Sequence, residues 1–272
     1  MTCDHSADTP YCPHCGERRA ADHAYTLAAI VAELWDHLAP ADGKALRSLW
    51  ALVRRPGALT TAYMRGSRQP YLSPLRLFLL VNAAYFAYAS LLNQHFLTTP
   101  LANHLGFGFY SATASAMVNA RIAARGVTLA AYAAKFDAVG DTQAKALVAA
   151  IVPMFAAVTA LVELRRPRPV LHHVTFGFHT IAALLCLFMG PYTVIALPLE
   201  VAIRSGRVGL GSLNPDLVIA TPMLVILWAW LWFGLRRAYG DGPWRGAVKA
   251  AVVAGSFGLI LGAYRALLFF TT

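Results

Sequence analysis

Apolar residues gather along the chain in long runs that are separated by shorter polar segments. Each run reaches the roughly 20 residues that an α-helix, rising about 1.5 Å per residue, needs to cross the hydrocarbon core of a bilayer. Pro153, the Gly190-Pro191 pair and Pro222 interrupt three runs and predict kinks, because neighbouring helices can satisfy the freed carbonyl groups. The pattern predicts an all-α membrane protein with about five transmembrane helices, near 73–92, 144–164, 172–197, 217–235 and 247–270.

Shorter segments outside these runs show the periodicity of amphipathic helices. Apolar residues recur at i, i+3 and i+4 in Thr26–Leu38 and again in Gly43–Arg55, where Trp50 and three aliphatic residues lie opposite basic side chains. Such helices lie on the inner leaflet, or they pack against the protein's own membrane domain; the sequence leaves both open. A weaker stripe over 111–136 predicts an interfacial helix on the outer face. The resulting division is a head at 1–22, interfacial helices at 23–72 and a transmembrane bundle at 73–272.

Composition supports the membrane class and gives an orientation. Hydrophobic residues make up 58% of the chain and charged residues only 13%, against about 25% charged in soluble proteins. Most Lys and Arg residues fall before the first run or in the two short turns near 165–168 and 236–249. Because basic residues gather on the cytosolic side, we expect a bacterial inner-membrane protein with a cytosolic N-terminus and a periplasmic C-terminus. The net charge of +10 then reflects contact with anionic lipid headgroups.

The N-terminus carries a Cys/His cluster that is typical of a zinc site. Cys12-Pro-His-Cys15-Gly is a C-x-x-C-G knuckle, and Cys3 and His5 complete four tetrahedral ligands, with His14 as an alternative fourth ligand. Met1–Arg19 lacks the apolar core of a signal peptide, so the thiols are expected in the reducing cytosol. A redox C-x-x-C would need a thioredoxin-like context that the sequence lacks. The prediction is a structural Zn²⁺ site.

Three histidines in the third run form a second cluster. His172 and His179 lie two helical turns apart and share a face, and His173 lies on a neighbouring face. An ionisable residue within a span is a functional-site hypothesis, here for metal binding, a proton relay or a substrate hydrogen bond. Two alternatives stay open. His172 and His173 are solvated at the cytosolic border of the membrane, or His179 forms a hydrogen bond between helices that orders the bundle. Glu163 is the carboxylate best placed to meet His172 or His173.

The order of these motifs resembles a known family. The knuckle is followed by Arg55-Pro-Gly, by the segment YMRGSRQPYLSP at 63–74 and by HHVTFGFH at 172–179. This series resembles the bacterial membrane proteins described as domain of unknown function 3667, and the resemblance implies a fold and a location rather than an activity. Two features differ from the family pattern. The first C-x-x-C is reduced to Cys3-x-His5, and His172 stands where the family tends to carry an acidic residue before the histidine of the third run.

The leading interpretation is a non-enzymatic scaffold or accessory subunit whose cytosolic head meets a protein partner. The sequence contains no G-x-S-x-G, no H-E-x-x-H and no phosphate-binding glycine loop. The alternative is a membrane-embedded enzyme or transporter that uses His172, His173 and His179 with Glu163 on a lipid or a small molecule. Nucleic-acid binding is not expected, because Arg18 and Arg19 are the only Lys or Arg residues before Tyr25, too few to bind a phosphate backbone.

Overall fold

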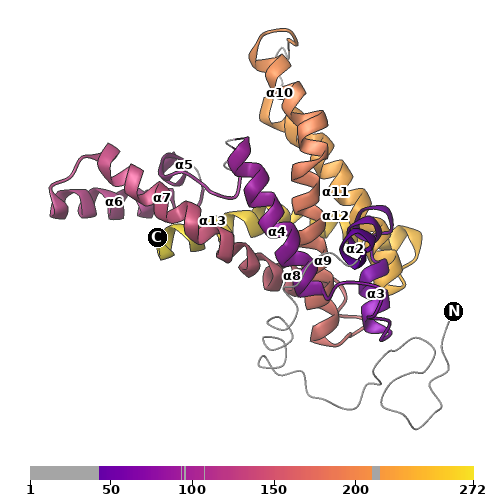
Figure 1. Ribbon diagram of the computed structural model, residues 1–272. Coiled ribbons are helices and arrows are strands. Elements are labelled where there is room, and N and C mark those ends of the chain that lie inside the picture. Colours follow the sequence, from indigo (N-terminus) through magenta and orange to yellow (C-terminus); the bar gives the residue numbers. More distant parts are fainter. Residues whose placement is uncertain (1–42, 93, 95, 107, 210–214) are drawn as a thin grey trace, which may run out of the picture.

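The computed structural model describes residues 43–92, 94, 96–106, 108–209 and 215–272 (Figure 1). All regular structure within these ranges is helical, which confirms the all-α prediction. The predicted zinc ligands and the amphipathic segment Thr26–Leu38 lie outside the described residues.

The helices in chain order are α2 (Lys44–Arg54), α3 (Ala58–Met64), α4 (Pro74–Leu91), α5 (Leu101–Gly106), α6 (Ser111–Arg125), α7 (Leu129–Leu147), the 3-10 turn η1 (Val148–Ala150), α8 (Ile151–Val162), α9 (Val170–Met189), the π-helical turn η2 (Tyr192–Ala196), α10 (Leu197–Arg204), α11 (Pro215–Tyr239), α12 (Pro243–Gly255) and α13 (Phe257–Thr271).

Four helical stretches of the described residues are long and apolar enough to cross a membrane: Pro74–Leu91, Leu129–Val162, Val170–Arg204 and Pro243–Thr271. The protein is therefore a multi-pass membrane protein. α11 has 25 residues, or about 37 Å of helix, and covers the range of the remaining predicted span.

The second stretch begins well before the predicted residue 144. The Thr128 hydroxyl accepts a hydrogen bond from the Ala131 amide at the first turn of α7, so an N-cap starts the helix inside the predicted loop. Val118 and Phe136, from the stripe predicted at 111–136, are buried in a small separate cluster with Tyr110 and Phe269. Both halves of that stripe are thus helical, as α6 and the start of α7.

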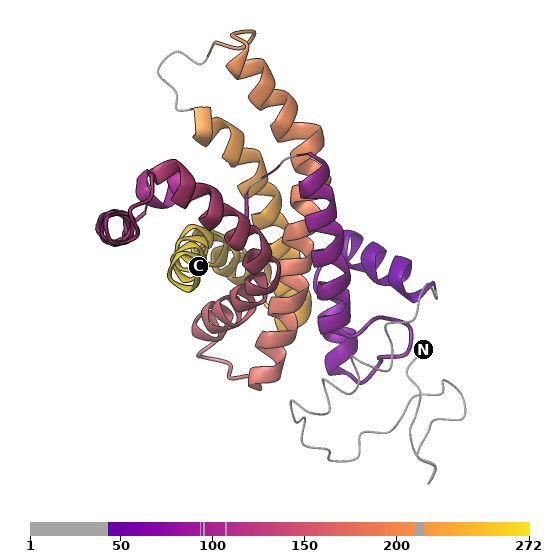
Figure 2. The same ribbon diagram turned by 60° about the vertical axis from the view of Figure 1, so that its left-hand side comes forward.

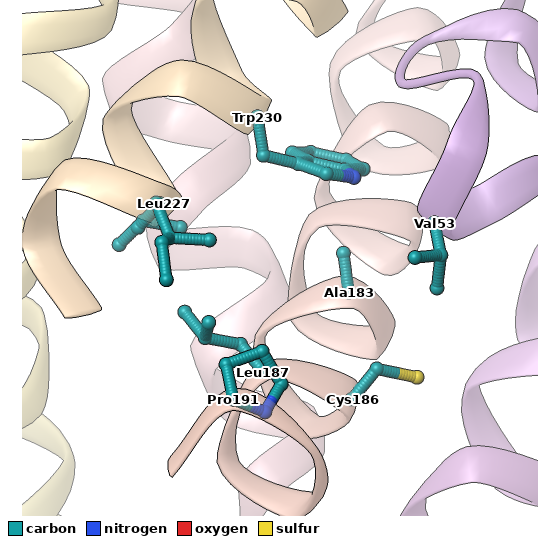
Figure 3. A pocket seen from close by; sticks show the side chains of 8 residues that line it. Val53, Ala183, Cys186, Leu187, Pro191, Leu227 and Trp230 are labelled. Carbon is teal, nitrogen blue, oxygen red and sulfur yellow. The ribbon is translucent and has the colours of Figure 1, made fainter. Parts of the chain in front are cut away.

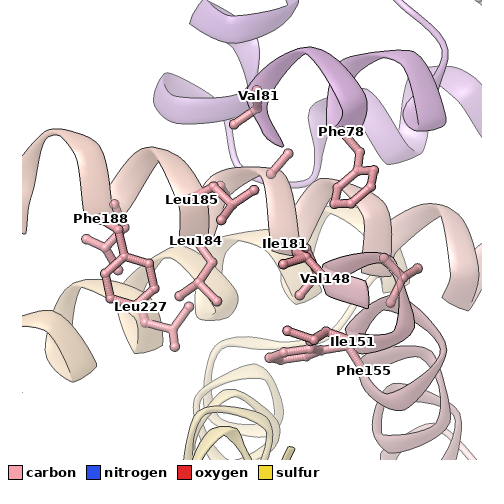
Figure 4. Close-up of a cluster of buried hydrophobic side chains, with 14 of the residues drawn as sticks. Phe78, Val81, Val148, Ile151, Phe155, Ile181, Leu184, Leu185, Phe188 and Leu227 are labelled. Atoms are coloured by element: carbon pink, nitrogen blue, oxygen red, sulfur yellow. The ribbon is translucent and has the colours of Figure 1, made fainter. Parts of the chain in front are cut away.

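α9 is the central helix of the bundle. It packs against α2, α3, α4, α8 and α11, and most of its side chains are buried. Figure 4 shows its aliphatic and aromatic residues between those of α4 on one side and those of α8 and α11 on the other. Gly177 permits the close approach to α8, since a β-carbon there would lie 3.0 Å from the Val152 carbonyl oxygen. α9 ends at Met189, and the predicted Gly190-Pro191 break becomes the π-helical turn η2.

The turns predicted to be cytosolic lie together at one end of the bundle, at the bottom of Figure 1. The Arg237 guanidinium donates to the Pro56 carbonyl at 3.0 Å, and the Arg168 guanidinium donates to the Tyr239 carbonyl at 3.4 Å. These bonds join α3, the α8–α9 turn and the end of α11. We call this the basic end.

The helix predicted at Gly43–Arg55 is α2, and it ends before Pro56-Gly57 as the sequence indicated. α2 packs on the bundle through Ser48, Ala51 and Leu52, while Leu46, Trp50 and Val53 are exposed. Contact with the protein's own helices, one of the two alternatives, is therefore present, and it coexists with an exposed apolar face. Figure 2 shows the helices of the bundle from a second side.

A sharp corner joins α2 to α3. Gly57 has φ +77°, and a β-carbon there would lie 2.5 Å from the Gly234 carbonyl oxygen of α11. Glycine is thus required both by the backbone angle and by the close backbone approach. The corner fixes where α3 lies against α9 and α11.

A candidate functional site at the basic end

Six polar side chains converge where α8, α9, α11 and α12 meet at the basic end. Glu163 follows the last residue of α8, His172 and His173 lie in the first turn of α9, and Tyr239 ends α11. We call these residues, with Asp241 and Lys249, the polar cluster. All are buried except Lys249, whose side chain is 19% exposed.

An ion triad holds three of these residues together. The Lys249 ammonium lies 2.5 Å from Oε1 of Glu163, and 2.8 and 3.0 Å from the two carboxylate oxygens of Asp241. Lys249 comes from α12, Glu163 from the end of α8 and Asp241 from the α11–α12 turn. One cation therefore meets two carboxylates that water scarcely reaches.

The shortage of positive charge favours a proton on the triad. Glu163 is the first residue beyond the second membrane stretch, and burial raises the pKa of its carboxyl group. The Lys249 contact opposes this change and the Asp241 charge adds to it, with the net direction upward. Glu163 thus holds a proton more readily than a carboxyl group in water.

Tyr239 connects the triad region to the histidines. Its hydroxyl lies 3.0 Å from Nδ1 of His173, and its ring stacks on the His173 ring with the centroids 5.4 Å apart. The centroid of the His172 ring is 4.6 Å from that of Tyr239. The hydroxyl also lies within hydrogen-bonding reach of Thr159 on α8. Tyr239 therefore ties three helices together at this end.

His172 has an unpartnered nitrogen. The side chain is only 6% exposed, and its buried Nε2 has no hydrogen-bond partner among the described residues. A buried polar atom without a partner is costly, on the order of 1–3 kcal/mol. Among the buried side-chain atoms of the polar cluster, as far as the chain is described, this nitrogen alone lacks a hydrogen-bond partner.

His179 belongs to a different contact. Its Nδ1 lies 2.8 Å from the Thr60 hydroxyl of α3, and both side chains are fully or almost fully buried. On the face of α9 that the two histidines share, His172 contacts Tyr239 of α11 and His179 contacts Thr60 of α3. The structure brings His172 and His173 together around Tyr239 and places His179 on α3.

Glu163 meets a different partner from the one predicted. Its ion pair is with Lys249, and no hydrogen bond to His172 or His173 is present in the described part of the chain. Lys249 occupies the position between two carboxylates where a cation would sit. The described residues contain no group of three or more His, Cys, Asp and Glu side chains that is able to hold a metal ion.

Sequence reasoning missed four contributors: Tyr239, Asp241, Lys249 and Thr60. Lys249 and Arg237 counted only toward the orientation, and the turn around Asp241 was considered only for its basic residues. One signal was present. Asp241 is an acidic residue between two predicted spans of a protein with few acidic residues, and Lys249 lies only eight residues further along the chain. The spacing of residues along the sequence does not show that Lys249 also meets Glu163, which follows the last residue of α8.

A comparison with protein families gives one match. The family model described as "Protein of unknown function (DUF3667)" matches residues 42–86. This range covers α2, the Gly57 corner, α3 and most of α4. No curated protein and no solved structure matches the sequence.

Proposed function

We propose that this protein, whose residues 42–86 match the DUF3667 family model, is a scaffold or accessory subunit of the bacterial inner membrane that catalyses no reaction of its own. In this proposal five helices span the bilayer, with α11 as the fourth. The basic end faces the cytosol and the C-terminus faces the periplasm, in keeping with the gathering of basic turns at one end.

One observation carries the proposal. The buried polar groups at the basic end bond to groups on other helices: Lys249 to Glu163, Tyr239 to His173, and Thr60 to His179. Polar contacts of this kind hold transmembrane helices in a fixed arrangement. A rigid bundle whose ionisable groups are used for its own packing is suited to presenting a surface to a partner.

The N-terminal head supplies the proposed meeting point with that partner. Residues 1–22 carry the zinc ligands proposed from the sequence, Cys3, His5, Cys12 and Cys15. A closed four-ligand site is structural rather than catalytic. We expect one zinc per purified chain, lost in the Cys12→Ser/Cys15→Ser variant and retained in His172→Ala/His179→Ala.

A combined substitution of the ion triad tests the non-enzymatic role. Removing a buried ion pair as a whole is often close to neutral for stability, whereas removing one partner is not. The Glu163→Gln/Asp241→Asn/Lys249→Met variant should fold as the wild type does and should complement a deletion strain. Lys249→Met alone should lose complementation through loss of folded protein. A triple variant that folds normally but fails to complement would overturn the proposal.

A second function, a membrane enzyme or transporter, is favoured by the unpartnered Nε2 of His172. In that case Nε2 of His172 would bind a substrate or accept a proton next to Tyr239 and the ion triad. His172→Phe keeps the ring packing against Tyr239 and removes only the nitrogens. A stable His172→Phe protein that complements fully would exclude this second function, and a stable protein that does not complement would establish it over the scaffold role.

A further inference from the structure

A partly open apolar groove lies between α2, α9 and α11 (Figure 3), and none of its lining residues belongs to the polar cluster. Its volume is about 150 Å³. The walls include Val53 of α2, Ala183 and Cys186 of α9, Pro191 after the helix break and Trp230 of α11. Apart from the Cys186 thiol, the lining side chains are hydrocarbon or aromatic.

The sequence explains why the groove stays open and apolar. α9 ends at Met189, and Pro191 and the π-helical turn η2, which packs against α11, interrupt the regular α-helix beside the groove. The indole N–H of Trp230 donates to the Leu52 carbonyl at 2.9 Å, which satisfies its only polar atom. Small side chains at Ala183 and Cys186 leave the space unfilled.

The rim of the groove combines apolar and basic groups. Val53 lines the groove and is 55% exposed, and Trp50 lies one turn earlier on the same helix. Arg54 and Arg55 follow directly and are exposed, with the Arg54 guanidinium 4.3 Å from the centroid of the Trp50 ring. An apolar cleft beside exposed arginines fits a molecule with an apolar chain and an anionic head.

No carboxylate of the surrounding segment neutralises this charge. Residues 43–92 contain no Asp and no Glu, while their basic residues are Lys44, Arg47, Arg54, Arg55, Arg65, Arg68 and Arg76. Neither Arg54 nor Arg55 makes an ion pair with another described residue. Within the described part of the chain, the charge of Arg54 and Arg55 is therefore not balanced by a carboxylate.

We propose that the groove, Arg54 and Arg55 together bind an acidic glycerophospholipid of the surrounding bilayer. One acyl chain fills the groove along α9 toward Pro191, and the phosphate and its headgroup lie at the two arginines. The proposal rests on the membrane placement of the chain and not on the scaffold role. Basic residues on an amphipathic helix at the inner leaflet attract anionic lipid, at about 1 kcal/mol for each Lys or Arg.

The bound lipid has a structural consequence. The acyl chain touches Val53 on one side and Ala183 and Trp230 on the other, so it bridges α2 to the bundle. α2 then docks more firmly in a membrane that is rich in acidic lipid. The lipid is a component of the α2 contact rather than one of the exchanging lipids around the protein.

Native mass spectrometry of the full chain in detergent tests this site, with phosphatidylglycerol and phosphatidylcholine of identical acyl chains as probes. The wild type should retain one phosphatidylglycerol in preference to phosphatidylcholine. Arg54→Gln/Arg55→Gln should lower the retained fraction about 30-fold, the product of two arginine contributions. Ala183→Phe should lower it similarly by filling the groove. The matched controls are Arg125→Gln, on exposed α6, and Ala83→Phe, on the exposed face of α4.

Alkylation of Cys186, quantified by peptide mass spectrometry, gives a second measurement. Phosphatidylglycerol should slow the reaction of this thiol in the wild type and have no effect in Arg54→Gln/Arg55→Gln. Equal retention of both lipids would overturn the proposal. So would binding that survives Ala183→Phe, because the acyl chain would then lie elsewhere. Each result is independent of complementation, so failure here and failure of the scaffold role are told apart.

Discussion

Replacing Lys249 by Met removes the only cation of the ion triad and keeps the aliphatic length of the side chain. Glu163 and Asp241 then remain beside each other with side chains only 2% and 1% exposed. At these exposures, bulk water scarcely reaches either carboxylate to replace the ammonium. The substitution therefore exposes the cost of burying the two acids without a counter-charge.

The expected loss is about 3–5 kcal/mol, the usual cost of breaking a buried ion pair by removing one partner. Lys249 is 19% exposed, so some solvent already screens its contacts and the lower part of that range is expected. Even about 3 kcal/mol changes the unfolding equilibrium by about two orders of magnitude. The effect is thus far larger than that of removing an exposed lysine.

The loss should depend on pH with a definite sign. Burial already raises the pKa of Glu163 above its ordinary 4.5, and removing Lys249 removes the contact that lowered it. A carboxyl group with a raised pKa binds more protons in the folded state, so stability falls as pH rises from about 4.5 through the raised value. The variant should therefore approach the wild type near pH 5 and differ most near pH 8.

Unfolding in mixed micelles with increasing SDS, followed by tryptophan fluorescence, measures the free energy. Lys145→Met is the control, because Lys145 is exposed and its side chain makes no ion pair among the described residues. A change below about 1 kcal/mol, or a pH dependence equal to that of the wild type, would refute the buried-triad reasoning.

Three further predictions concern the other contacts. Gly57→Ala should destabilise the protein more than Gly66→Ala does, since both have positive φ but only Gly57 has a carbonyl oxygen 2.5 Å from the added carbon; thermal melting of the two variants compares them, and equal shifts would contradict the close packing on Gly234. His179→Ala should cost about 2–4 kcal/mol by leaving a cavity and an unpartnered Thr60; a smaller loss in Thr60→Val/His179→Leu than in the single variant is the check. A C-terminal alkaline phosphatase fusion should be active, as a periplasmic C-terminus requires, and an inactive but stable fusion would mean that the orientation or the number of spans is wrong.

The local pattern of the sequence was enough to predict the class and much of the helix content. The apolar runs, the break at Gly190-Pro191 and the end of α2 before Pro56 follow from composition, side-chain periodicity and proline geometry, which act over a few residues. The family resemblance in 63–74 also agrees with the matched range 42–86. The early start of α7 was missed because a single capping threonine gives a weak signal.

Only the tertiary structure decided how the polar residues are used. The bonds between Tyr239 and His173, Lys249 and Glu163, and Thr60 and His179 join residues 66, 86 and 119 positions apart. Their partners depend on which helix lies beside α9 and at what depth, and side-chain periodicity along one helix does not contain that information. The groove beside Val53 arises in the same way, because it exists only where α2, α9 and α11 meet. The sequence by itself therefore determined that the helices would form in a membrane, and the packing of the helices determined which side chains meet.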